Sequence, residues 1–179
     1  MKISDDVDYS AIRGMTSELK AEIDNAIHNI QKEYDIKLSS ITSGKKGRGD
    51  IFGSGPYIDD DGNLKFGLAL NSDIDYNRVK QKIYVRYSKG IFAGKSIEDY
   101  IAHEMAHIMV YQNCTDINAY NTKKAIIDKL FVAGISGYAD DSKSGDESLA
   151  EAFVKYRNKE KIPLKAEILI KTYIERWKK

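Results

Sequence analysis

Apolar residues recur at helical spacing in some stretches of the chain and alternate with polar residues in others. Residues 17–34 carry apolar side chains three or four positions apart, with charged side chains between them, which predicts an amphipathic helix. Residues 36–42 alternate between apolar and polar and predict a strand. Residues 57–58 and 64–70 are apolar and flank the turn-forming residues 59–63, so we predict a β-hairpin there.

The strongest helical pattern runs from Ser96 to Asn113. Ser96 precedes the apolar run and Asp99 follows three residues later, which is typical of a capped helix start. Because the pattern is apolar over much of its circumference, we expect this helix to be buried. It contains His103 and His107, which lie four residues apart and therefore one turn apart on the same face.

The segment His103-Glu104-Met105-Ala106-His107 has the spacing of a zinc site that carries its own base. Both imidazoles can reach one ion, and Glu104 lies beside them. The alternative is a pair of hydrogen-bonded structural histidines, but two imidazoles buried without partners are costly. We therefore prefer the metal site. The third histidine of the chain, His28, falls on the polar side of the first predicted helix, where we expect it to be solvated.

Residues 82–87 place Ile83, Val85 and Tyr87 in alternation with other side chains, which predicts a half-exposed strand just before the metal helix. If this strand lies at the sheet edge beside the ion, an extended peptide can pair with it through main-chain hydrogen bonds. The sequence thus predicts a surface on which a peptide docks by strand addition.

Two histidines leave a catalytic zinc ion one protein ligand short of its usual three, and a carboxylate must supply the third. Helical patterns follow at residues 117–132, at about 147–157 and after Pro163. The second of these helices begins with Glu147 and carries Glu151 on the same face. One of these two carboxylates can bind zinc while the other orients a ligand.

The chain of 179 residues is long enough for one domain with a sizeable core. We divide it into an N-terminal helix region 1–35, a core with the zinc site 36–158 and a packing helix 159–179. Helices combined with few strands predict an α+β fold, in which a small twisted sheet packs on the metal helix and further helices follow. A net charge of +1 gives no general electrostatic support for nucleic-acid binding.

Cys114 is the single cysteine, so neither an intrachain disulfide nor a multi-cysteine zinc site can form. Residues 1–6 lack the apolar core of a signal peptide, and no apolar run approaches membrane-spanning length. We expect a cytoplasmic protein without membrane contact. The oligomeric state is left open.

Three motifs together resemble a known family: His-Glu-x-x-His at 103–107, Ser-x-Tyr-Ala at 136–139 and Glu-x-x-Ala-Glu-Ala-Phe at 147–153. They are similar to the metallopeptidase domain of anthrax lethal factor and its relatives, which include the Pro-Pro endopeptidases of clostridia. Similar domains occur in bacteriophage minor head proteins and mobile elements, which makes association with a phage particle conceivable. The resemblance covers about residues 83–157 and implies a zincin-like fold.

The resemblance assigns roles to individual residues. It implies that His103, His107 and Glu147 bind zinc, that Glu104 is the general base and that Tyr138 faces the developing oxyanion. It also implies that Glu151 supports the ligands from behind. The expected function is that of a gluzincin-like zinc metalloendopeptidase acting on a peptide or protein. The alternative is a non-catalytic, zinc-stapled protein-binding module of a phage or mobile-element assembly.

Three other patterns are weaker. Residues 140–151 match several positions of a calcium-binding EF-hand loop, but Glu147 stands where that loop has an apolar residue. Residues 90–96 resemble a phosphate-binding loop with one residue too few between its glycines. Residues 43–56 contain five glycines and predict a solvated loop, whose cations could hold an anionic partner: Lys45, Lys46 and Arg48.

Overall fold

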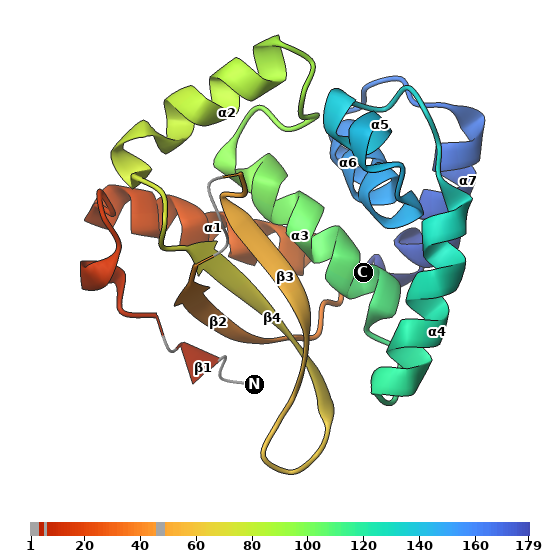
Figure 1. The fold of residues 1–179 in the computed structure, drawn as a ribbon, viewed down its shortest axis with the longest axis horizontal. Coiled ribbons are helices and arrows are strands. Elements are labelled where there is room, and N and C mark those ends of the chain that lie inside the picture. Colours follow the sequence, from red (N-terminus) through yellow and green to blue (C-terminus); the bar gives the residue numbers. More distant parts are fainter. Residues whose placement is uncertain (1–3, 6, 46–48) are drawn as a thin grey trace.

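Helices and a small mixed sheet make up the fold (Figure 1), so the predicted α+β class is confirmed. The computed structural model describes residues 4, 5, 7–45 and 49–179. The strands are β1 (Ser4–Asp5), β2 (Leu38–Gly44), β3 (Phe52–Ile58) and β4 (Leu64–Asn71). The helices are α1 (Ser17–Glu33), α2 (Val79–Ser88), α3 (Ile97–Tyr111), α4 (Ile117–Ile127), α5 (Gly137–Ser142), α6 (Gly145–Arg157) and α7 (Leu164–Tyr173). Short 3₁₀ turns occur at Tyr9–Ala11, Tyr76–Arg78, Asp128–Leu130 and Glu175–Trp177.

The sheet has the strand order β1-β2-β4-β3. β2 runs parallel to both β1 and β4, whereas β3 runs antiparallel to β4. The predicted hairpin is therefore present, with Ser54 of β3 opposite Leu68 of β4. β3 lies at the edge of the sheet, and its outer side pairs with no other strand among the residues described. This edge lies against the helix that carries the two histidines.

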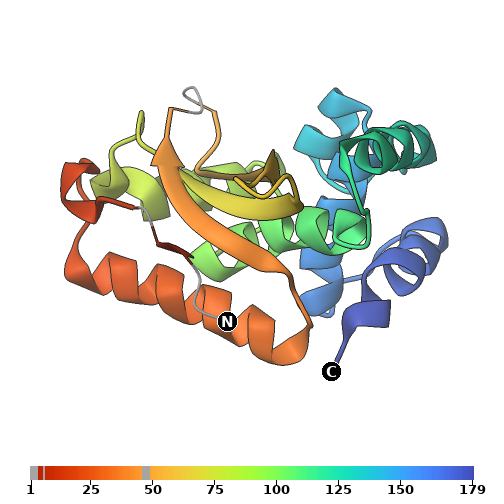
Figure 2. The ribbon, with the colours of Figure 1, turned by 90° about the horizontal axis from the view of Figure 1, so that it is seen from below.

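Helix α3 is the centre of the packing. Figures 1 and 2 show the sheet on one side of it and helices α4 to α7 on the other. Its start is the predicted one, since the Ser96 hydroxyl accepts a hydrogen bond from the Asp99 amide at 3.1 Å. Twelve of its fifteen residues are buried, which explains why its apolar pattern covers most of the circumference. The predicted buried helix is thus confirmed.

The predicted strand at residues 82–87 is wrong, because these residues belong to α2. Only Val79 and Ile83 of this helix are buried, and their four-residue spacing is helical. Val85 and Tyr87, which a strand would bury beside Ile83, are 38% and 37% exposed. A six-residue alternation is too short to separate the two periods, and no neighbouring strand supplies the pairing. Strand addition at this segment is therefore excluded.

The predicted loop at residues 43–56 is wrong at both ends, because β2 extends to Gly44 and β3 already begins at Phe52. Pairing with β4 supplies the backbone hydrogen bonds that hold this glycine-containing segment extended. Lys45 is exposed, whereas Lys46 and Arg48 lie outside the described residues. Residues 140–142, also expected in a loop, form the end of α5.

The remaining helices agree with the sequence patterns to within a few residues. α1 and α7 lie where the periodicity places them, while α4 ends at Ile127 and continues as a 3₁₀ turn. Across the described ranges, no helix has both the length and the apolar character needed to cross a membrane.

The helical assignment of α2 predicts unequal effects of two similar substitutions. Ile83→Ala should lower the free energy of unfolding by about 2–4 kcal/mol, because it removes a side chain that is 2% exposed. Val85→Ala should change it by about 0.5 kcal/mol or less, because Val85 lies at the surface. Urea denaturation of both variants measures the difference. Equal losses would mean that residues 83 and 85 share one buried face.

Candidate metal centre

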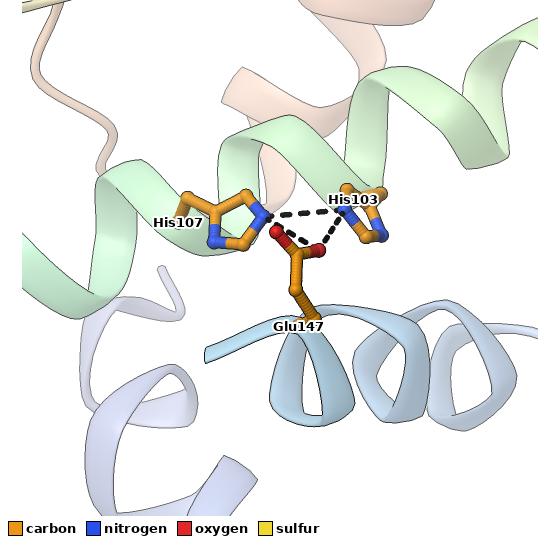
Figure 3. Close-up of side chains that lie close together, drawn as sticks. All are labelled: His103, His107 and Glu147. Carbon is orange, nitrogen blue, oxygen red and sulfur yellow. Dashed lines mark hydrogen bonds and ion pairs between the residues drawn. The ribbon is translucent and has the colours of Figure 1, made fainter. Parts of the chain in front are cut away.

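Three ligand-type side chains converge between α3 and α6 (Figure 3). His103 and His107 extend from successive turns of α3, and Glu147 extends toward them from the first turn of α6. The two Nε2 atoms lie 3.2 Å apart. Glu147 Oε2 lies 3.2 Å from Nε2 of His103 and 3.6 Å from Nε2 of His107. One nitrogen from each ring and one carboxylate oxygen thus surround a common point.

The opposite nitrogen of each ring contacts another carboxylate of α6. Nδ1 of His103 lies 2.9 Å from Glu151 Oε1, and Nδ1 of His107 lies 3.0 Å from Asp146 Oδ1. A carboxylate accepts a hydrogen bond, so each Nδ1 carries the proton and each Nε2 presents its lone pair to the common point. Carboxylate-to-histidine contacts of this kind fix the orientation of metal-binding imidazoles.

The carboxylates of Glu151 and Asp146, which support the two rings, each have a further polar partner. Glu151 Oε2 accepts a hydrogen bond from the Ala93 amide at 2.8 Å, and Glu151 is fully buried. Asp146 Oδ2 lies 3.2 Å from the Lys124 ammonium group of α4. Both imidazoles thus contact carboxylates of α6, and these carboxylates are fixed by the Ala93 amide and by Lys124, which limits how far the rings can rotate.

The start of α6 is fixed by its local sequence. The Ser144 hydroxyl accepts hydrogen bonds from the amides of Asp146 and Glu147, as an N-cap residue does. Gly145 follows, and a Cβ atom at this position would overlap the carbonyl oxygen of Ile127. Glycine thus lets the first turn of α6 approach the end of α4 closely. This approach sets the position of the two acids that follow Gly145.

The charges around the rings favour a cation. Burial lowers the pKa of His103, but the carboxylates of Glu147 and Glu151 outweigh burial and raise it to about 10. Burial likewise lowers the pKa of His107, and Asp146 followed by Glu147 raises it well above its usual value. Burial raises the pKa of Glu147, but the two rings bring it well below the ordinary range. The electrostatic potential at the common point between these groups is therefore negative and favours a cation.

The residues present fit a divalent metal ion. Glu147 Oε2 is buried and makes no hydrogen bond of acceptable geometry, although it lies close to both rings. The two Nε2 atoms face each other at 3.2 Å, a spacing at which they either share a proton or bind one cation between them. Two imidazole nitrogens with one carboxylate oxygen form a three-ligand set that zinc uses when a further position stays open.

Glu104 lies next to the cluster without belonging to it. The Ser54 hydroxyl of β3 lies 2.8 Å from Glu104 Oε2 and 3.0 Å from the Glu104 carbonyl oxygen. A hydroxyl donates one hydrogen, and the charged carboxylate is the stronger acceptor. Ser54 therefore orients the Glu104 carboxylate from the sheet edge. Sequence reasoning missed this contact, because Ser54 falls within the stretch interpreted as a loop.

Tyr138 belongs to α5 and lies near the cluster without contacting it directly. Its ring centre is 6.2 Å from that of His103, and Phe92 contacts both rings. The amide of Tyr138 donates to the Ile91 carbonyl at 2.8 Å, which joins α5 to the segment before α3. Burial, followed by the negative charge of Glu147, raises the pKa of Tyr138 above its usual value. Its hydroxyl therefore keeps its proton and can donate a hydrogen bond.

These groups open onto one cleft with a volume of about 310 Å³. Its walls come from several elements. β3 contributes residues 52–56, α3 and α6 contribute the His-His-Glu cluster, and α5 and α2 contribute Tyr138 and Arg86. A peptide lying along the free edge of β3 would pass over Glu104 and the cluster.

The structure brings together the sequence-predicted candidates. His103, His107 and Glu147 converge, Glu151 lies behind His103, and Glu104 faces the same cleft. The contact of Asp146 with His107 was missed, and its adjacency to Glu147 gave no indication of it. His28 is exposed, as expected.

The EF-hand interpretation is contradicted. Asp140 and Ser142 lie in α5, whereas Gly145 and Glu151 lie in α6, so residues 140–151 form two helices and no calcium loop.

Comparison with protein-family models, curated proteins and solved structures finds no match to this chain. The resemblance to the lethal factor group thus depends on the three sequence motifs. The convergence of His103, His107 and Glu147 is an observation independent of that resemblance.

The cluster predicts the metal content of purified protein. We expect about one zinc ion per chain in the parent and a large loss in His103→Ala, His107→Ala and Glu147→Ala. Asp146→Asn and Glu151→Gln should bind zinc about 10 to 100 times more weakly, because they support the rings without touching the ion. Elemental analysis and chelator competition measure these effects.

His28→Ala is the matched control, since it removes an exposed imidazole outside the cluster. Full zinc content in Glu147→Ala would show that a residue other than Glu147 is the third ligand. Absence of zinc from the parent would contradict the site.

Proposed function

We propose that this chain is a zinc-dependent metalloendopeptidase with the ligand set of the gluzincins, related to the lethal factor group. The observation that carries the proposal is the position of Glu104. Its carboxylate is held by Ser54 beside the His103, His107 and Glu147 cluster and faces the same cleft. A purely structural metal site has no use for such a group, whereas hydrolysis needs a base at this place.

Each residue then has a chemical task. A zinc ion in the cluster would supply Lewis acidity that activates water and polarises the peptide carbonyl. Glu104 accepts the proton of the attacking water and passes it to the nitrogen of the leaving amine. The Tyr138 hydroxyl donates a hydrogen bond to the carbonyl oxygen as that oxygen gains negative charge. Asp146 and Glu151 keep the two imidazoles in one tautomer and orientation.

The free edge of β3 supports a peptide as the substrate. An extended peptide can pair with unpaired main-chain groups of an edge strand and thereby lie across the site. β3 offers this edge directly beside α3, and Ser54 is the third of its seven residues. The edge strand that the docking hypothesis requires is thus β3 in place of residues 82–87.

Glu104→Gln distinguishes an enzyme from a zinc-stapled binding module. An enzyme should keep its zinc and its fold, yet lose turnover by about 100- to 10,000-fold, because the amide cannot accept the proton. Tyr138→Phe should lose less, about 100-fold at most, because it removes one hydrogen-bond donor. Cleavage of a mixed peptide library, read by mass spectrometry, measures both. Unchanged cleavage in both variants would contradict the mechanism, and no cleavage by zinc-loaded parent would favour the binding module.

Ser54→Ala tests whether the sheet edge positions the base. We expect kcat to fall about tenfold with KM nearly unchanged, because a charge-assisted hydrogen bond to Glu104 is lost. Ser54→Thr restores a hydroxyl and should recover most of kcat. Ser43→Ala is the control, since Ser43 is exposed on β2 outside the cleft. A rise in KM alone would assign Ser54 to peptide binding instead.

A further inference from the structure

We propose that Arg86 makes the cleft selective for a peptide that carries a carboxylate close to the bond being cleaved. The inference rests on the proposed peptidase function and adds a substrate class to it. It depends on the position of the Arg86 guanidinium group in the cleft and on the buried Tyr100 hydroxyl near it.

Arg86 and Lys124 are the cations that line the cleft. Lys124 already forms two ion pairs, since its ammonium group lies 3.2 Å from Asp146 and 3.5 Å from Asp128. Arg86 extends from α2, is partly buried and forms no ion pair with any carboxylate in the described ranges. A guanidinium group that forms no ion pair keeps hydrogen-bond donors in a fixed planar arrangement, which a carboxylate can accept in pairs. A carboxylate from a bound peptide would supply such an acceptor.

The groups beside Arg86 also suit a carboxylate. Arg86 and Tyr100 line the same cleft. Burial raises the pKa of Tyr100 to about 12, and the nearby positive charge of Arg86 partly offsets this rise. The Tyr100 hydroxyl is buried and makes no hydrogen bond of strict geometry within the described ranges, although the Arg86 guanidinium group lies near it. A carboxylate between the two residues can accept hydrogen bonds from the guanidinium group and from the hydroxyl.

This position lies near the reacting atoms. Tyr100 precedes Glu104 by one turn of α3, or about 6 Å along the helix axis. The Tyr100 ring stacks on Phe92 with ring centres 4.3 Å apart, and Phe92 lies 5.0 Å from the His103 ring. A peptide residue spans about 3.4 Å when extended, so the carboxylate belongs to a residue one or two positions from the cleaved bond.

Two sources of this carboxylate exist, an aspartate or glutamate side chain and the free carboxyl terminus of the peptide. The probe is a random peptide library prepared in two forms, with free and with amidated carboxyl termini, and cleavage sites are read by mass spectrometry. Cleavage beside acidic residues in both forms assigns the side chain. Cleavage of the free form alone, near its end, assigns the terminus.

Arg86→Gln should lower cleavage of carboxylate-containing sites by about tenfold or more, with little change at other sites. Arg86→Glu should shift the preference toward lysine and arginine. Arg78→Gln is the matched control, because Arg78 is exposed just before α2 and outside the cleft. An unchanged acidic preference in Arg86→Gln, or an equal loss at all sites, would overturn the inference and leave the peptidase function intact.

A binding measurement separates the two proposals further. Dipeptide hydroxamates chelate zinc without being cleaved, and calorimetry can compare a glutamate hydroxamate with its glutamine counterpart. The parent should bind the glutamate compound about tenfold more tightly, and Arg86→Gln should bind both equally. Equal binding by the zinc-loaded parent would overturn the role of Arg86. Zinc-loaded protein that neither cleaves the library nor binds a hydroxamate would overturn both proposals.

Discussion

The contact between the imidazoles of α3 and the carboxylates of α6 is the constraint on which the site depends. Asp146, Glu147 and Glu151 face the two rings, and Lys124 is the single ammonium group among them. With both imidazoles neutral, as binding to a metal requires, three carboxylates against one ammonium group leave two negative charges in a largely buried interface. Such charges destabilise a protein unless they are balanced. A divalent cation at the common point of the ligands balances them, so the metal would also stabilise the packing of α6 on α3.

The sequence reveals those parts of the site that depend on local spacing. Helix α3 is predictable because its cap and its apolar period lie within one segment, and the pairing of His103 with His107 follows from the helix itself. Glu147 and Glu151 share a face of α6 for the same reason. Their assignment as ligand and support needed the family resemblance, because spacing alone leaves the two carboxylates interchangeable. The structure shows Glu147 beside both Nε2 atoms and Glu151 behind His103.

Contacts between distant segments were not predictable. Asp146 meets His107 because Gly145 lets α6 approach the end of α4, and no local pattern encodes that approach. Ser54 reaches Glu104 across fifty positions of sequence. The strand that carries it contains glycines that weaken a strand in isolation. Pairing with β4 stabilises this strand, and such pairing depends on tertiary structure that periodicity cannot reveal.

Because residues 82–87 form a helix and not the predicted strand, the Arg86 side chain points toward the cleft. In a strand, Ile83 and Arg86 would point to opposite faces, because side chains alternate. In a helix, residues three positions apart lie on nearly the same side, so Arg86 of α2 lies on the side of the buried Ile83 and reaches the cleft. The same helical turn leaves Tyr84 at the surface, 69% exposed. Because residues 82–87 are helical, they add no strand to the sheet beyond β3, and they place the Arg86 guanidinium group in the lining of the cleft.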